Sequence, residues 1–184
     1  MPGATGRGPG ARRDRVERAR AAGYAVRAMT RADADDVARV HAQVWRETYP
    51  GLMRPETLDG LDPVAAADRW RAAFDSGAPV PLRLAVAPDG SIAGMISVGP
   101  SRDDDPPVPT ELRAINVLAT HHGTGVADLL VADALGDEPA SLWVVAGNAR
   151  ALAFYDAHGF APDGTRKDDD MLLPGVDEVR LVRR

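Results

Sequence analysis

The chain has 184 residues, 45% of them hydrophobic, so it is long and apolar enough to bury the core of one domain. It contains no cysteine, which excludes disulfides, thiolate metal ligands and a cysteine nucleophile. The formal net charge is −5, yet residues 1–23 carry a net +4, so the remaining 161 residues carry −9.

The first 23 residues predict a disordered or loosely helical basic tail. Residues 1–10 are rich in glycine and proline, and Arg12–Ala22 suits only a short surface helix, because it lacks an apolar face. The tail has no apolar segment typical of a signal peptide, and no run in the chain approaches the roughly 20 apolar residues that span a bilayer. We therefore expect a cytoplasmic protein that binds neither a membrane nor, despite the basic tail, a nucleic acid.

From residue 24 onward, the spacing of apolar residues predicts one folded domain over residues 24–184. Predicted strands begin at Tyr24, Leu82, Ile92, Glu111, Leu142 and Phe160, and a final hairpin joins Met171–Leu173 to Glu178–Val182 through Pro174-Gly175. Predicted helices cover Asp33–Tyr49, a segment from Asp62-Pro63, Gly123–Leu135 and Asn148–His158. This order places meandering strands before a β-α-β unit, so we expect an α/β fold with a mixed sheet and helices on both faces.

A glycine-rich turn at His121–Ala127 follows the strand Glu111–Leu118 and opens a helix. The first turn of a helix has N–H groups without intrahelical partners, and the helix dipole is positive there. Gly123 and Gly125 let the backbone approach an anion, and the small Ala127 allows the same in the first helical turn. A Walker A loop is excluded, since no Gly-Lys-Ser/Thr follows, and the third glycine of the dinucleotide pattern is missing. The turn predicts a pyrophosphate site.

A second pattern follows the strand that begins at Leu142. Asn148, Ala151 and Tyr155 fall on one face of the predicted helix. Helix capping explains Asn148, and core packing explains the neighbouring Phe154. Neither helix capping nor core packing explains Tyr155. It points along the helix face that begins at the end of the strand, where a β-α-β unit opens a cleft.

Together, the two patterns resemble the GNAT superfamily of acetyl-CoA-dependent N-acetyltransferases. The family motif Gln/Arg-x-x-Gly-x-Gly/Ala reads here as the six residues from His122 to Ala127. The marker Asn-x-x-Ala-x-x-Phe-Tyr-x-x-x-Gly-Phe is met at Asn148, Ala151, Phe154, Tyr155, Gly159 and Phe160. The resemblance implies a mostly antiparallel sheet with a splayed parallel strand pair, and acetyl-CoA as co-substrate without a metal. It covers residues 24–184, as a single acyl-CoA N-acyltransferase domain.

The resemblance also implies a cofactor site between the strands that begin at Glu111 and Leu142. Its residues are Val117, Leu118, His122, Gly123, Thr124, Gly125, Val126, Ala127, Asn148 and Tyr155. His122 departs from the family, which has glutamine or arginine there. A neutral imidazole donates one hydrogen bond and a protonated one adds an ion pair, so we expect a weaker or pH-dependent grip on the cofactor. The alternative is that His122 faces solvent.

By the same resemblance, a primary amine attacks the thioester directly, without an acyl-enzyme. Tyr155 matches the general acid that protonates the leaving thiolate. Glu111 aligns with a general base, and we expect partial burial to raise its pKa toward the working range. Glu47 is the competing base, and a chain of waters is the third option.

The acceptor is predicted to lie against Trp45, Glu47 and Tyr49, which line the acceptor pocket in the family. The acidic runs Asp103–Asp105 and Asp168–Asp170 can attract a cation, although such runs are more often solvated loops. These features favour a small cationic amine, such as an antibiotic, a polyamine or an amino-acid derivative. A protein or peptide acceptor, another acyl group and a non-catalytic acyl-CoA-binding module stay open as alternatives. A homodimer is expected only by analogy with the family.

Overall fold

The computed structural model describes residues 9–168 and 176–184. The helices are α1 (Pro9–Ala21), α2 (Ala34–Thr48), α3 (Pro55–Asp59), α4 (Pro63–Asp75), α5 (Val126–Ala134) and α6 (Ala149–Ala157). The strands are β1 (Ala25–Ala28), β2 (Leu82–Val86), β3 (Ile92–Pro100), β4 (Thr110–Val117), β5 (Ala140–Val145), β6 (Ala161–Asp168) and β7 (Asp177–Arg183). Short 3-10 turns cover Arg31–Asp33 and Ala119–His121. Within the described ranges, no helix is long and apolar enough to cross a membrane.

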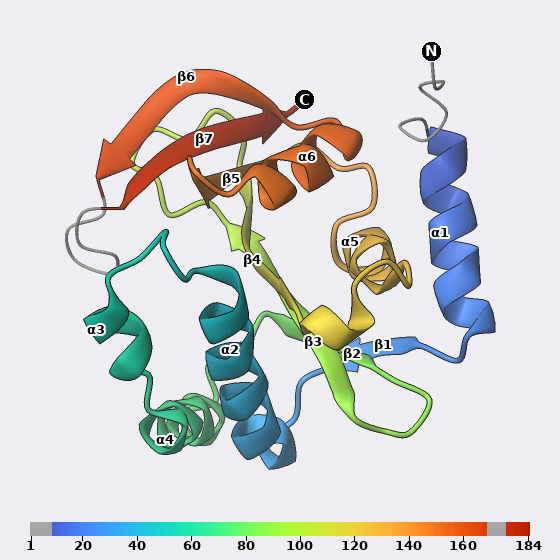
Figure 1. Ribbon diagram of the computed structural model, residues 1–184, viewed down its shortest axis with the longest axis vertical. Helices are drawn as coiled ribbons and strands as arrows, with labels where there is room; N and C mark the ends of the chain where they lie inside the picture. Colours follow the sequence, from blue (N-terminus) through green and yellow to red (C-terminus); the bar gives the residue numbers. More distant parts are fainter. Residues whose placement is uncertain (1–8, 169–175) are drawn as a thin grey trace.

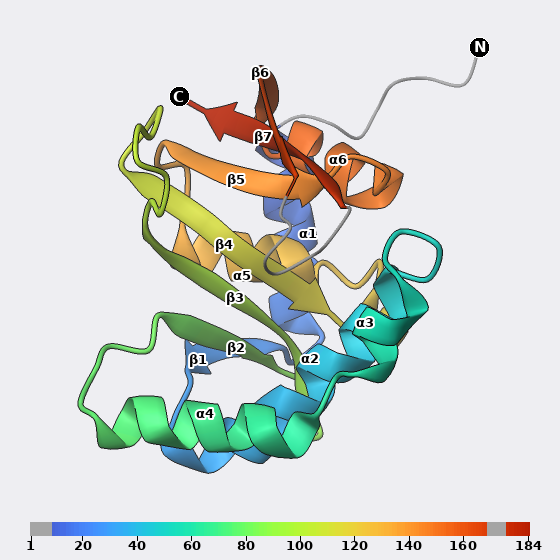
Figure 2. The same ribbon diagram turned by 90° about the vertical axis from the view of Figure 1, so that its left-hand side faces the viewer.

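The strands form one sheet in the order β1-β2-β3-β4-β5-β7-β6 (Figures 1 and 2). Among the strands of the described residues, only β4 and β5 are parallel neighbours, and the other neighbours are antiparallel. Helices α2 and α4 lie on one side of the sheet, and α5 and α1 lie on the other (Figure 1). The predicted mixed sheet with helices on both faces is confirmed.

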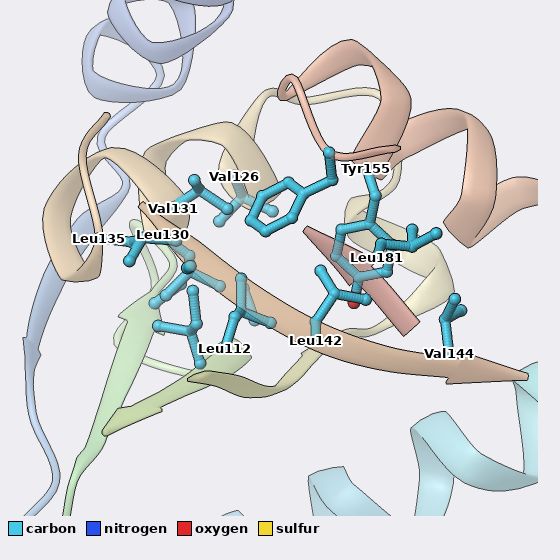
Figure 3. Close-up of a cluster of buried hydrophobic side chains, with 14 of the residues drawn as sticks. Leu112, Val126, Leu130, Val131, Leu135, Leu142, Val144, Tyr155 and Leu181 are labelled. Carbon is cyan, nitrogen blue, oxygen red and sulfur yellow. The ribbon is translucent and has the colours of Figure 1, made fainter. Parts of the chain in front are cut away.

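Two clusters of buried side chains hold the helices to the sheet. Val37 of α2 packs with Leu84 of β2 on one face. On the other face, Leu130 of α5 and Tyr155 of α6 pack with Leu142 of β5 (Figure 3). Neighbouring residues of a strand point to opposite faces, so one strand such as β2 serves both clusters.

Strands β4 and β5 are in register only where Glu111 faces Ser141, within the described residues. From there toward their carboxyl ends the two strands diverge (Figure 1). On its other edge, β5 pairs with β7 along its whole length, from Ala140 opposite Arg183 to Val145 opposite Glu178. A register shift opposite Ser97 and Val98 of β3 adds one residue to β4, and such bulges bend a strand. The sheet is therefore split at the β4–β5 junction.

The local signals place several helix ends where the sequence predicts them. The Asp62 carboxylate accepts hydrogen bonds from Val64 N (2.9 Å) and Ala65 N (3.1 Å), which caps α4. Asn148 caps α6 by accepting from Ala151 N at 3.1 Å. The expected cap at Asp33 is different, because its carboxylate bonds back to Thr30, which precedes the 3-10 turn, and to Arg27 of β1.

The N-terminal segment forms a helix that packs on the domain. Ala19 of α1 is completely buried, and Arg15 of α1 pairs with Asp128 of α5 (Nη2 to Oδ1, 3.0 Å). Residues 1–8 lie outside the described part of the chain. So do the predicted Asp169 and Asp170, Met171–Leu173 and Pro174-Gly175.

Candidate active site

A cavity of about 730 Å³ lies where β4 and β5 diverge, a volume typical of cofactor-sized sites. The predicted site residues that line it are Trp45, Tyr49, Glu111, Val117, His122, Gly123, Gly125, Val126, Ala127, Asn148 and Tyr155. Three predicted residues do not line it, namely Glu47, Leu118 and Thr124. The geometry therefore brings the two sequence patterns to one cavity.

The glycine turn at one end of this cavity has a backbone that only glycine adopts without strain. Gly123 has φ +77° and Gly125 has φ +89°. These angles delay the start of α5 to Val126, three residues after the predicted helix start. Gly125 is the N-cap residue and has no side chain to cap the helix, so the positive end of α5 can receive an anion.

Two of the three predicted residues outside the cavity lining hold the turn in place. Thr124 Oγ1 donates to His121 O (2.8 Å) and accepts from Val126 N (3.3 Å). Glu47 accepts from Ala119 N at 2.9 Å. Glu47 is exposed and braces the turn through this bond, and it is not among the residues that line the cavity.

His122 is exposed and has an arginine beside it. Arg150 Nη1 lies 2.9 Å from His122 Nδ1, and His122 Nε2 lies 3.0 Å from Val117 O. The tautomer with its proton on Nε2 satisfies both contacts, since Nδ1 then accepts and Nε2 donates. A guanidinium therefore stands beside the position where the family has glutamine or arginine.

Arg150 was missed in the sequence, although a signal exists. It lies in the first turn of α6, where a cation is unfavourable with respect to the helix dipole. Such a placement indicates a compensating anion nearby.

Glu111 is 2% exposed and lies at the closed end of the split sheet. Its carboxylate accepts from Arg102 N (2.9 Å), Nε (3.1 Å) and Nη2 (2.5 Å). Burial alone would raise the pKa of Glu111, but the hydrogen bonds and charge of Arg102 outweigh it and lower the pKa below its ordinary value. The expectation of a raised pKa is wrong, because the sequence does not reveal that Arg102 folds back onto Glu111.

Tyr155 lies against the same cavity from α6 and is 7% exposed. Its ring packs edge-on against Phe154 (5.5 Å between centroids) and Phe160 (5.9 Å) and points from α6 toward β5 (Figure 3). Burial raises the pKa of Tyr155 far above its ordinary value. The phenol is therefore fixed in position and protonated at neutral pH.

The predicted acceptor end has an aromatic wall. Trp45 and Tyr49 pack edge to face with 5.4 Å between ring centroids, and His41 stacks on Trp45 at 4.9 Å. Glu178 of β7 is a buried carboxylate that lines this end, and Lys167 Nζ lies 3.6 Å from its Oε2. Burial, with the charge of Glu178, raises the pKa of Tyr49. The sequence gives no signal for Glu178, which reads as an ordinary strand residue.

The acidic run Asp103–Asp105 adds only one carboxylate to the lining of the cavity. Asp103 lines the cavity, but it accepts from Trp143 Nε1 at 3.0 Å and from Arg180 Nη1 at 3.0 Å. Asp104 and Asp105 are exposed and outside the lining. Asp103 therefore acts first as a structural link between the loop, β5 and β7.

Comparison with known proteins identifies relatives over most of the chain. The model of the acetyltransferase (GNAT) family matches residues 36–160. The uncharacterized N-acetyltransferase YuaI of Bacillus subtilis (strain 168) is 28% identical over 143 residues, which cover 74% of this chain and 79% of YuaI.

Solved structures share the fold at low identity. The PaiA N-acetyltransferase of Thermoplasma acidophilum, in complex with coenzyme A, has a TM-score of 0.64 at 15% identity, covering 88% of this chain and 99% of PaiA. An N-acetyltransferase of Staphylococcus aureus Mu50 has a TM-score of 0.61 at 17% identity, covering 86% of this chain and 99% of that one.

Proposed function

The chain belongs to the GNAT family of acetyltransferases, and on this premise we propose that it transfers the acetyl group of acetyl-CoA to a primary amine of a small, cationic acceptor. The observation that carries this proposal is the cavity in the split sheet, with the glycine turn at one end and Tyr155 and Glu111 on its walls. We further propose that residues 24–184 form the acyltransferase domain. A cytoplasmic location and a homodimer stay predictions.

The proposed reaction is a direct transfer. The amine loses a proton, its nitrogen attacks the thioester carbonyl carbon, and a tetrahedral intermediate forms. The C–S bond then breaks, and Tyr155 donates its phenolic proton to the departing thiolate. The attacking nitrogen loses its second excess proton as the amide forms, and this proton restores the phenol of Tyr155. The products are an amide and coenzyme A. The diverging strands support this arrangement, because the edge of β4 near Val117 offers backbone groups to an extended pantetheine arm.

Glu111 is proposed as the group that receives the proton of the amine. Because Arg102 lowers its pKa, Glu111 is ionised throughout pH 6–9. We expect Glu111→Gln to reduce kcat/KM on the order of 100-fold at every pH in this range, as general-base catalysis is lost. Steady-state kinetics across the pH range measures this.

A matched variant tests the same assignment from the other side. In Arg102→Gln, burial raises the pKa of Glu111 without the opposing guanidinium, so the acidic limb of the kcat/KM profile should move to higher pH. An unchanged pH profile of kcat/KM in Arg102→Gln, or full activity of Glu111→Gln, would contradict this assignment. The proton of the amine would then pass to water or to Glu178.

The acceptor class rests on charge and on the aromatic wall. Residues 24–184 carry −9, which attracts cations from a distance, and Trp45 and Tyr49 offer faces for the carbon skeleton of an amine. A thiol-release assay with polyamines, aminoglycosides, amino-acid amides and short peptides tests this class. We expect turnover of at least one small polycationic amine. Turnover of peptides alone would favour a protein acceptor, and acetyl-CoA binding without turnover would favour the non-catalytic module.

A further inference from the structure

Helix α1 lies beside the glycine turn, although it precedes the region that the family model matches. A Cβ atom added to Gly125 would collide with the carbonyl oxygen of Arg15, so the backbones of α1 and the turn are in direct contact. The segment that leaves α1 makes a second contact, a 2.8 Å hydrogen bond between the Tyr24 hydroxyl and His121 Nδ1. Helix α1 and the segment that follows it thus contact the turn at both of its ends.

Arg15, the residue at this contact, carries a guanidinium. It lines the cavity together with Gly123, Gly125 and Ala127, and its side chain is 26% exposed. Its Nε donates to Asp128 Oδ1 at 3.0 Å. A guanidinium presents its N–H donors in a planar fork that matches the oxygens of a phosphate. Arg15 is therefore oriented by Asp128 while it borders the space where the turn would hold an anion.

Asp128 has a second partner in α6's C-cap residue, His158. It is 7% exposed, and His158 Nε2, from the residue that ends α6, lies 3.3 Å from its Oδ1. Burial alone would raise the pKa of Asp128, but its bonds to His158 and Arg15 lower it, so the carboxylate is ionised at neutral pH. The chain thus holds Arg15 with a buried, charged partner.

We propose that α1 forms an outer wall of the cofactor site and that Arg15 donates hydrogen bonds to a phosphate group of acetyl-CoA. This inference rests on the proposed function, because it needs acetyl-CoA in the cavity. Arg15 from α1 and Arg150 from α6 then supply cations to the polyanionic end of the cofactor from two different elements. The N-terminal helix is part of the binding site rather than an appendage.

The test compares full-length variants by titration calorimetry with coenzyme A. Arg15→Ala should weaken binding about tenfold, the effect of one lost charge-assisted hydrogen bond, and Arg15→Lys should recover part of it. Arg18→Ala, an exposed position on the same helix, is the control and should bind like the wild type. Dephospho-coenzyme A identifies the phosphate: the Arg15→Ala loss persists if Arg15 contacts the pyrophosphate and disappears if it contacts the 3′-phosphate.

A phosphate-free donor separates binding from structural damage. With S-acetylpantetheine, the KM of Arg15→Ala should equal that of the wild type, whereas a distorted turn would raise it. Equal or tighter binding of coenzyme A by Arg15→Ala, or an equal loss with S-acetylpantetheine, would overturn the proposal for α1. If the wild type does not bind coenzyme A, the proposed function fails instead.

Discussion

Tyr155→Phe is expected to lower kcat by roughly 10- to 1,000-fold and to leave the KM for acetyl-CoA almost unchanged, the signature of a lost general acid. Only the hydroxyl is removed, so the packing of the ring between Phe154 and Phe160 is kept. Because burial raises the pKa of Tyr155, the wild-type residue is protonated throughout the neutral range, the form that a proton donor needs.

Tyr49→Phe is the matched control, since it removes a second phenol from the same cavity. Tyr49 lies with Trp45 and near Glu178, at the proposed acceptor end, so its loss should change the KM for the amine more than kcat. Stopped-flow or steady-state thiol release measures both variants. An unchanged kcat in Tyr155→Phe would remove this tyrosine from the mechanism.

Gly125→Ala should destabilise the fold by about 3 kcal/mol or more, because two costs combine. An alanine at φ +89° is strained by about 1–2 kcal/mol, and its Cβ atom must also push α1 away at Arg15. Gly123→Ala has a similar φ of +77°, but nothing lies within 4 Å of its Cβ position. This variant should therefore lose only the conformational part, about 1–2 kcal/mol.

Urea unfolding of both variants gives the two free energies. The difference between them isolates the contact of α1 with the turn, since the backbone cost nearly cancels. Equal losses would mean that α1 is not docked at Gly125 in solution, and they would remove the basis for placing Arg15 in the cofactor site.

The fold was predictable where the chain carries local signals. Asp62-Pro63 begins a helix because proline suits the first helical position and the Asp62 carboxylate caps the helix. The side chain of Asn148 caps α6 in the same way. The short helix at Pro55–Asp59 was missed, because five residues contain too little periodicity to recognise. The docking of α1 was missed for another reason: its buried residue is a small alanine, Ala19, and its polar anchor is 113 residues away from Arg15.

The candidate site divides in the same way. Tyr155 and the glycine turn are recognisable because their spacing is local, within one strand–helix unit each. Glu178 depends on which distant segments the sheet brings together, and no spacing in the sequence expresses that. The lowered pKa of Glu111 is a similar case, since a carboxylate and its arginine are related only through the path of the loop between them.

The split between β4 and β5 gives this sheet an edge in its interior. Edge strands usually invite pairing with other chains, and proteins cover or charge them to prevent aggregation. Here the stretch of β4 beyond Glu111 borders the cavity. A pantetheine arm, which has amide groups of its own, is the group that we propose to pair there. On this proposal, the bound arm supplies the strand hydrogen bonds that β4 lacks on this edge. We therefore expect amide hydrogens near Val117 to exchange more slowly once a pantetheine arm is bound.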